Sequence, residues 1–162
     1  LSLLENKLDE LIIERLGLTK SKPLAIDDWR RMLDRVRHPD HELTIAVVGK
    51  YVKHFDAYKS VYESLGHAGI AHRARVRIQR IDAEEIERDG ASEVLVGVDG
   101  LLVPGGFDKR GVPGKIAAIR FARERQLPFF GICYGLQCAT IEIARHLAGL
   151  EGANTTEVDP DT

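Results

Sequence analysis

The 162-residue sequence has few cysteines and no long hydrophobic run. Cys133 and Cys138 lie five positions apart on one expected helix, a poor geometry for a disulfide, so we expect reduced thiols in an intracellular protein. No apolar run approaches the roughly 20 residues that span a bilayer. The opening LSLLENKLDELIIERLG carries too many charges for a signal peptide. These absences predict neither a disulfide scaffold nor a membrane partner.

The sequence also has no large excess of positive or negative charge. Lys and Arg number 23 and Asp and Glu 25, a formal net charge of −2, so bulk charge predicts no nucleic-acid partner. The cysteines and histidines lack the spacing of metal ligands, so we expect no metal site. With 44% hydrophobic and 30% charged residues, the composition is that of a folded globular domain.

Residues 1–40 predict two amphipathic helices with a polar stretch around Pro23 between them. The first helix, which Gly17 ends, has apolar residues at helical spacing: Leu4, Leu8, Leu11, Ile12 and Leu16. The second, between Asp27 or Asp28 and Pro39, has another apolar stripe: Trp29, Met32, Leu33 and Val36. Short isolated helices are marginal in water, so we interpret residues 1–40 as a linker or docking element.

Strand and helix patterns alternate from residue 41 onward. Buried or alternating apolar runs predict strands over 43–51, 73–81, 99–106 and 128–133. Helical patterns cover 56–68, 83–88, 111–125 and 134–147, and we expect the first of these helices to end near Gly69. We expect these residues to face inward: Ala57, Val61, Leu65, Val112, Ile116, Ile119, Ala122, Leu136, Ala139, Ile143 and Leu147. The alternation predicts an α/β fold with a parallel sheet flanked by helices and right-handed crossovers.

The last of these strands ends in the segment Gly-Ile-Cys-Tyr-Gly-Leu-Gln (131–137), which matches the nucleophile-elbow pattern with cysteine in place of serine. A tight strand-to-helix turn would hold the Cys133 thiol at a helix N-terminus, whose dipole favours the thiolate. The backbone N–H of Tyr134 would then point at the oxygen of an attacked carbonyl. The alternative is a small buried cysteine beside glycines that serve only a tight connection.

A second strand ends in Val-Pro-Gly-Gly-Phe (103–107). Ligands bind at the carboxyl ends of parallel strands, and a glycine lets its backbone N–H approach a ligand closely. If the two strands are neighbours, one N–H from this loop and one from Tyr134 would form an oxyanion hole. On its own, the Gly105–Gly106 pair is also typical of a simple turn.

The stretch VDGLLVPGGFDKRGVPGKIAAIRFARERQLPFFGICYGLQ resembles the glutamine amidotransferase domain of the CTP synthase family. IAVVGKYVKHFDAYKSVYESLGHAG and IEIARHLAGLEGANTTEVDPDT extend the resemblance. The elbow alone is typical of all class I amidotransferases, whereas RGVPGKIAAIRFARE and ANTTEVDPDT are more specific. The resemblance implies a flavodoxin-like class I amidotransferase fold over 41–162, and for 1–40 a helical link from a synthetase domain.

The resemblance also implies roles for individual residues. Cys133 matches the nucleophile that attacks the side-chain amide of glutamine, and Gly106 matches the glycine whose backbone helps to hold the substrate and its oxyanion. Glu157 matches the residue that binds the amino-acid head group, and Arg110 sits in the loop that responds to the activator GTP. The segment that lines the glutamine pocket is matched by Tyr134, Gly135, Leu136 and Gln137.

Three positions depart from the family pattern. Asp108 stands where the family has glycine after PGGF, which affects the expected GTP response. Tyr134 and Leu136 replace the common leucine and methionine. Both changes are tolerable, because the function expected at 134 belongs to the backbone.

A thiol nucleophile of this class needs a base and a carboxylate to orient it. The family places these on a His and a Glu one residue apart, downstream of the elbow, so the resemblance predicts a domain that is incomplete at its C-terminus and inactive by itself. His146 lies 13 residues along the elbow's helix, about 20 Å from Cys133. His54 follows the first strand, and we interpret it as an exposed loop residue.

The resemblance implies a cytoplasmic homotetrameric enzyme that passes ammonia from glutamine to its own synthetase domain, which aminates UTP with ATP and magnesium. No cofactor is expected within these 162 residues, and GTP is the expected allosteric activator. Two alternatives remain open. One is another class I amidotransferase, serving GMP, anthranilate or carbamoyl phosphate synthesis. The other is a non-catalytic docking module with the same fold.

Overall fold

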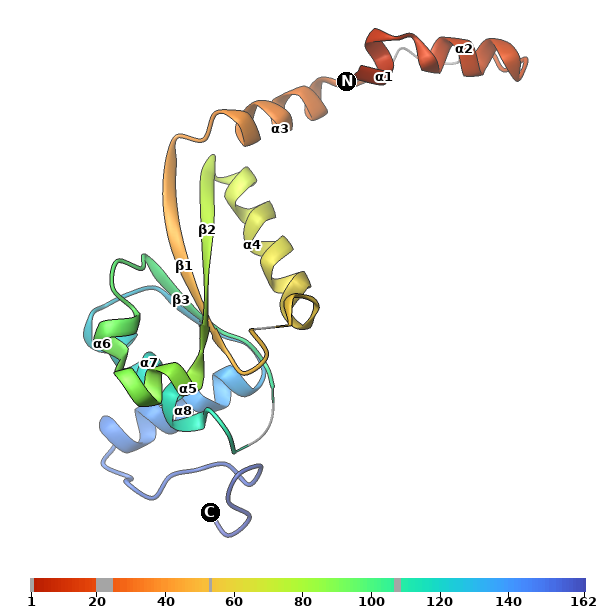
Figure 1. The fold of residues 1–162 in the computed structure, drawn as a ribbon. Coiled ribbons are helices and arrows are strands. Elements are labelled where there is room, and N and C mark those ends of the chain that lie inside the picture. Colours follow the sequence, from red (N-terminus) through yellow and green to blue (C-terminus); the bar gives the residue numbers. More distant parts are fainter. Residues whose placement is uncertain (1, 20–24, 53, 107–108) are drawn as a thin grey trace. The chain divides into compact units, whose positions relative to one another are not determined.

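The computed structural model describes residues 2–19, 25–52, 54–106 and 109–162 (Figure 1). The chain divides into two compact units, residues 1–34 and 35–162. Among the described residues, no helix combines the length and the apolar character needed to cross a membrane. The second unit holds the sheet and every residue that the sequence singled out for a function.

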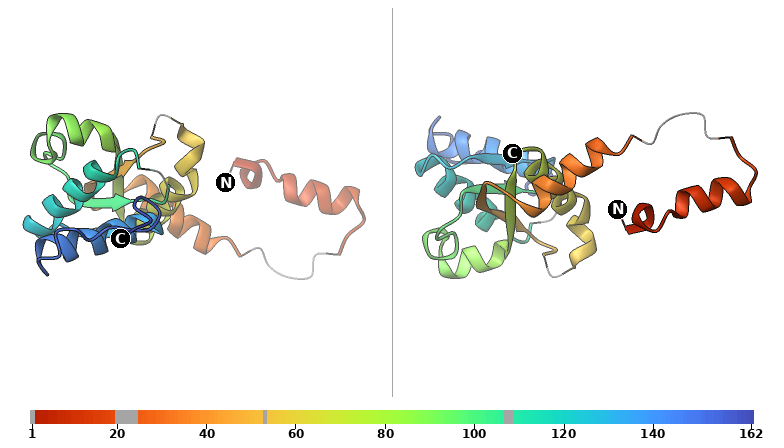
Figure 2. Two further views of the ribbon diagram at one scale, coloured as in Figure 1. Left: turned by 90° about the horizontal axis from the view of Figure 1, so that it is seen from below. Right: turned by 90° about the horizontal axis from the view of Figure 1, so that it is seen from above.

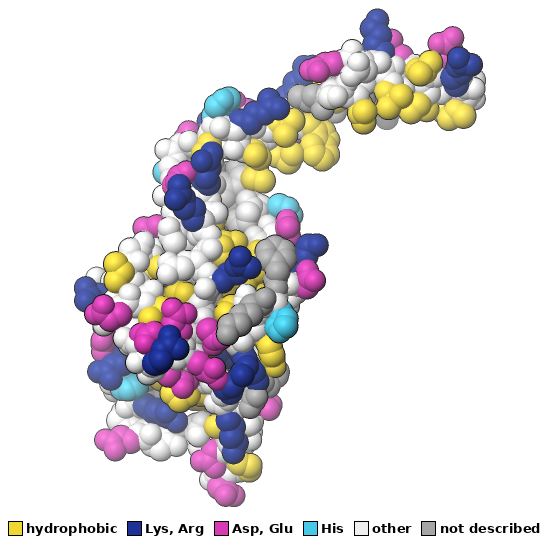
Figure 3. Space-filling model, viewed as in Figure 1, with side chains coloured by type: hydrophobic (Ala, Val, Ile, Leu, Met, Phe, Trp, Pro, Cys, Tyr) yellow, Lys and Arg dark blue, Asp and Glu magenta, His cyan; other side chains and the backbone are white. Residues whose placement is uncertain are grey.

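The first unit contains α1 (Ser2–Glu5), α2 (Leu8–Arg15) and most of α3 (Asp27–Arg37). The prediction of one continuous first helix was wrong, because Lys7 adopts a left-handed conformation with φ 54° that separates α1 from α2. Gly17, with φ 62°, follows the end of α2 as predicted. Hydrophobic side chains of these helices lie on the surface (Figure 3), Leu11 and Trp29 among them. Their assignment to a linker stays a prediction.

A four-stranded parallel sheet forms the second unit, as the alternating pattern predicted. Its strands are β1 (His41–Gly49), β2 (Ala74–Asp82), β3 (Gly100–Val103) and β4 (Phe129–Gly131), in the order β2-β1-β3-β4. All three pairings are parallel. Because β3 and β4 are neighbours, the loops that leave their carboxyl ends emerge side by side.

Helices cover both faces of the sheet (Figure 2). They are η1 (Phe55–Tyr58), α4 (Lys59–Ala71), α5 (Ala83–Asp89), α6 (Ala91–Val94), α7 (Val112–Glu124) and α8 (Tyr134–His146). Val47 and Leu102 face η1 and α4, whereas Ala46 and Leu101, one residue earlier, pack with α5, α7 and α8. The period of two along each strand therefore builds two hydrophobic clusters. The short α6 was not predicted.

The helix expected over 56–68 differs at both ends. It begins as the single 3₁₀ turn η1, where Ala57 is exposed rather than inward, and α4 continues through Gly69 to Ala71. Gly69 is not a stop signal. A Cβ at Gly69 would lie 2.7 Å from the carbonyl oxygen of Ala74, so this glycine permits the close packing of α4 against β2.

The inward face of α8 was only partly predicted. Ala139 is buried as expected, but Leu136, Ile143 and Leu147 are exposed. The buried positions are instead Tyr134, Gly135, Cys138, Ala139, Ile141 and Glu142. The apolar pattern did not predict this buried face, because one of its residues is the acidic Glu142.

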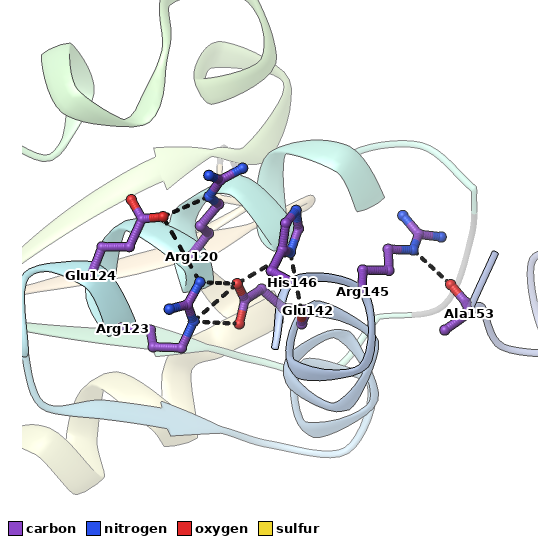
Figure 4. A network of polar contacts seen from close by, with 7 residues as sticks. All are labelled: Arg120, Arg123, Glu124, Glu142, Arg145, His146 and Ala153. Atoms are coloured by element: carbon purple, nitrogen blue, oxygen red, sulfur yellow. Dashed lines mark hydrogen bonds and ion pairs between the residues drawn. The ribbon is translucent and has the colours of Figure 1, made fainter. Parts of the chain in front are cut away.

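Glu142 has no exposed surface, and its carboxylate is clamped by Arg123 of α7 (Figure 4). The Arg123 guanidinium donates to both carboxylate oxygens at 2.8–3.1 Å, and Nδ1 of His146 lies 3.2 Å from Oε1. A buried carboxylate is tolerated when paired and fully hydrogen-bonded. This clamp fixes α8, the helix that follows Cys133, against α7.

Candidate active site

The two strand ends singled out by the sequence meet in the structure. Val103 pairs with Gly131, and the N–H of Ile132 donates to the carbonyl of Val103 at 3.0 Å. A Cβ built on Gly105 would lie 3.9 Å from Sγ of Cys133. The expectation that these strands are neighbours is confirmed, and the Gly105–Gly106 loop passes directly beside the thiol.

Cys133 has the strained backbone of a nucleophile elbow. Its φ of 53° and ψ of −111° are rare for a residue with a Cβ and cost on the order of 1–3 kcal/mol. Cys133 forms the N-cap of α8, and its side chain is exposed. Cys138 is buried, and that burial raises the pKa of its thiol to about 11, partly opposed by the charge of Lys115. The two thiols therefore differ sharply in access to a substrate.

The glycines on both sides of Cys133, Gly131 and Gly135, have no space for a side chain. A Cβ at Gly135 would lie 2.0 Å from the carbonyl oxygen of Val103, and one at Gly131 would lie 2.7 Å from the carbonyl carbon of Gly135. Both neighbours are backbone atoms, which cannot move aside without displacing β3 or α8. The elbow can therefore turn this tightly only with glycine at both positions.

Gly106 lies in the loop after β3, and Tyr134 directly follows Cys133 at the start of α8. Gly106 has φ 129°, a conformation favouring glycine, and its carbonyl accepts a hydrogen bond from Nζ of Lys115 at 3.1 Å. Tyr134 is the first residue of α8, where amide N–H groups point toward the helix N-terminus and hence toward Cys133. Its ring is completely buried, so only its backbone faces the site.

A pocket of about 330 Å³ opens one helical turn beyond the elbow, and it brings Gln137 and Glu157 together. Its lining consists of Gln137, Thr140, Ile141, Asn154, Thr155, Thr156 and Glu157. Oγ1 of Thr155 donates to Oε1 of Gln137 at 3.0 Å, and Nε of Arg145 donates to the carbonyl of Ala153 at 2.6 Å. These two bonds hold the C-terminal segment on α8. Leu136 is 60% exposed and does not line this pocket.

Arg110 extends from the loop before α7 and forms an ion pair with Glu84 of α5, Nε to Oε1 at 3.1 Å. Both side chains are about half exposed, and pairs of this kind contribute little to stability. Phe107 and Asp108 lie outside the described residues. The effect that Asp108 was expected to have on the GTP response therefore stays a prediction. The effector role of Arg110 stays a prediction.

Four histidines lie at the edge of the sheet opposite Cys133. His41 begins β1 and His38 precedes it, while His72 caps the C-terminus of α4, two residues before β2, and His67 lies in the second half of α4. Strand starts and strand ends occupy opposite edges of a parallel sheet. None of these four side chains is therefore available as a base for Cys133.

The other two histidines are also unsuited in this arrangement. His146 ends α8 and contacts Glu142, about 20 Å of helix away from the N-terminus of α8. His54 follows β1 at the correct edge, but it is exposed, as predicted, and no hydrogen bond joins it to Cys133 in the described structure. Within the described residues, no cluster of His, Cys, Asp and Glu could hold a metal ion.

Residue patterns missed two contributors to the site. Lys115 lies in the expected inward-facing helix 111–125 but was not predicted to be buried, and Thr155 was noted only as part of the TTE motif. A lysine between Gly114 and Ile116, within an apolar stripe, was a weak signal of burial. Nothing in the sequence alone pointed to the contact between Thr155 and Gln137.

Comparison with known proteins agrees with this geometry. The family model for "Glutamine amidotransferase class-I" matches residues 53–159. The CTP synthase of Desulfitobacterium hafniense (strain Y51) is 52% identical over 161 residues, and that of Acidiphilium cryptum (strain JF-5) is 53% identical over 156. These matches cover 99% and 96% of this chain but only 30% and 29% of the relatives, so the chain spans less than a third of their length.

A solved structure extends the likeness to three dimensions. It is described as the glutaminase domain of Trypanosoma brucei CTPS with bound acivicin, and it superposes with a TM-score of 0.68 at 41% identity. The match covers 74% of this chain and 47% of that one. The predicted fold class and the resemblance to the CTP synthase family are confirmed. The chain belongs to the class I glutamine amidotransferase family.

Proposed function

We propose that this chain is the glutamine-hydrolysing part of a CTP synthase, with Cys133 as the nucleophile. The observation that carries the proposal is the exposed Cys133 thiol on a strained turn, against the Gly105–Gly106 loop. The relatives described above are named CTP synthase and are about half identical in sequence, which favours this function over other class I amidotransferases. A non-catalytic docking module has no need of the strained elbow.

In the proposed reaction, the Cys133 thiolate attacks the side-chain amide carbon of glutamine. The N–H groups of Gly106 and Tyr134 stabilise the negative oxygen of the tetrahedral intermediate. The C–N bond then breaks, the nitrogen takes a proton and leaves as ammonia, and a thioester remains. Water attacks that thioester, glutamate leaves, and the thiol is restored.

Glutamine would lie along the first turns of α8. Gly135 allows the start of α8 to pack against Val103, Leu136 is exposed on the same turn, and Gln137 lines the pocket that also holds Glu157. We assign the Glu157 carboxylate to the ammonium of the amino-acid head group, because a charge-assisted hydrogen bond suits that pair. The Thr155–Gln137 bond keeps the segment before Glu157 at the pocket.

Proton transfer requires a base, and removing one member of such a set costs several orders of magnitude in rate. The placement of the six histidines supplies none to Cys133. We therefore propose that the 162 residues by themselves do not turn over glutamine measurably.

In the whole enzyme, the ammonia would reach a synthetase domain that aminates UTP to CTP, a step of pyrimidine nucleotide synthesis. ATP with magnesium would activate UTP in that domain. We assign GTP as the allosteric activator, with Arg110 as its candidate contact, and a cytoplasmic homotetramer as the assembly. The Arg110–Glu84 pair is exposed, so an anionic effector has access to the guanidinium.

The Glu157→Gln substitution tests the glutamine site. In the whole protein we expect KM for glutamine to rise about 10- to 100-fold, since a hydrogen bond to a charged group contributes about 1.5–3 kcal/mol. CTP formation from free ammonia should not change, and steady-state assays with each nitrogen source measure both. Glu151→Gln, exposed and outside the pocket, is the matched control. Unaltered glutamine kinetics in Glu157→Gln would make Glu157 a surface charge.

A further inference from the structure

Lys115 is a charged side chain with no exposed surface, in the first half of α7. Burying an ammonium group is costly unless it is strongly solvated by the protein. Its Nζ donates to the carbonyl oxygen of Gly106 at 3.1 Å and lies 5.0 Å from the centre of the Tyr134 ring. A cation over an aromatic face at this distance is attracted by the ring.

These two contacts connect the two halves of the proposed oxyanion hole. Gly106 belongs to the loop after β3, and Tyr134 belongs to the turn after β4. The two segments are 28 positions apart in the sequence, and a single ammonium group from a third element contacts both. Lys115 is therefore placed behind the donors, on the core side, rather than at the thiol.

The orientation of Gly106 matters for the chemistry. A glycine rotates more freely than any other residue, and a carbonyl oxygen turned toward the thiol would repel the oxygen that becomes negative. A hydrogen bond from Lys115 holds this carbonyl toward α7 instead. Donors that are fixed in advance are effective because they need not reorganise during the reaction.

We propose that Lys115 is a positioning residue for glutamine hydrolysis, which orients the Gly106 loop and anchors the Tyr134 turn so that the oxyanion hole is formed before substrate binds. The inference rests on the proposed glutaminase function. Lys115 acts through Gly106 and Tyr134 and touches no substrate. Its loss affects the transition state more than glutamine binding.

The test uses Lys115→Met and Lys115→Gln in the whole protein. Met keeps the unbranched apolar stem of lysine without a donor. Gln keeps a neutral donor, but its side chain, like that of Met, ends one bond short of the position of the lysine Nζ that contacts the Gly106 carbonyl. We expect kcat for glutamine hydrolysis to fall about 100-fold in each, the size of effect seen when one oxyanion donor is lost. KM should stay within about threefold, because binding uses other groups. Lys109→Met, exposed in the loop before α7, is the control.

A second readout separates positioning from a purely structural role. Alkylation of Cys133 by iodoacetamide needs no oxyanion hole, so its rate and pH profile should match those of the wild-type protein. Folded sites are counted as chains in which Cys133 is alkylated and the buried Cys138 is not, because Cys138 becomes accessible only on unfolding, and kcat is expressed per such site. If Lys115→Met does not fold, Lys115→Gln provides the same comparison.

Three results would be decisive against the proposal. An unchanged kcat per site in a folded variant would mean that Lys115 only fills the core. Lys115 would act on the thiol itself if the rate of Cys133 alkylation fell as much as kcat. A shift in the pH profile of that alkylation would mean the same. A rise in KM alone would assign it to substrate binding. If the wild-type protein hydrolyses no glutamine, the proposed function fails instead, and the two failures remain distinguishable.

Discussion

The Cys133→Ala variant of the whole protein is expected to lose glutamine-dependent CTP formation by about four orders of magnitude or more, because no thioester can form. Its ammonia-dependent reaction should stay at the wild-type level, since free ammonia bypasses the glutaminase site. The assay measures CTP formation with each nitrogen source, together with glutamate release. The split between the two sources is what identifies a catalytic rather than a structural cysteine.

Cys138→Ala is the matched control for this substitution. Cys138 lies on the same helix, is fully buried, and has a thiol whose pKa is raised to about 11, so it is protonated at neutral pH. We expect both nitrogen sources to remain within a few-fold of the wild-type rate. If Cys133→Ala instead lost the ammonia-dependent reaction, its role would be structural.

The second large effect is expected for Gly135→Ala. The new Cβ would lie 2.0 Å from the carbonyl oxygen of Val103, so α8 or β3 must shift. Overpacking of this kind costs about 1–3 kcal/mol and sometimes more. Moving the start of α8 also displaces Cys133 and the Tyr134 N–H, and we expect kcat for glutamine to fall by about 100-fold or more. Denaturant unfolding and glutamate release measure the two consequences.

Gly66→Ala provides the comparison, because Gly66 also lies in a helix but has no atom within 4 Å of an added Cβ. Helix propensity predicts that this change stabilises the protein by about 1 kcal/mol. The two Gly→Ala substitutions should therefore change the unfolding free energy in opposite directions. Equal stabilisation by both would contradict the packing described for the elbow.

Hydrophobic periodicity predicted the order and type of the four strands and of the helices α4, α5, α7 and α8, but not η1 or α6. The runs that became β1 and β2 are long, and their apolar or alternating pattern fits strands. The pattern failed where packing outweighed residue type. Gly69 was expected to end a helix, but the close approach of β2 requires a glycine inside α4. Leu136 was expected inside, but the buried face of α8 includes Glu142.

Local motifs predicted the candidate site better than the connections that support it. The elbow around Cys133 and the loop at Gly106 both carry glycines at fixed offsets, and these are visible in a single sequence. The contact of Lys115 with Gly106 depends on how α7 lies beneath the β3 loop, and the contact of Thr155 with Gln137 depends on how the chain returns to α8. Such contacts between distant segments leave no local signature.

Covalent labelling of Cys133 by a glutamine-mimicking electrophile is the most direct test of the central claim. No Lys or Arg lies between Cys133 and Cys138, so trypsin leaves both in one peptide, and tandem mass spectrometry must assign the modified sulfur. In the native whole protein near pH 8, we predict one equivalent of label on Cys133, blocked by glutamine, with Cys138 unmodified. Labelling of Cys138 at the same rate, or labelling of Cys133 that glutamine does not block, would contradict the assignment of Cys133 as the glutaminase nucleophile.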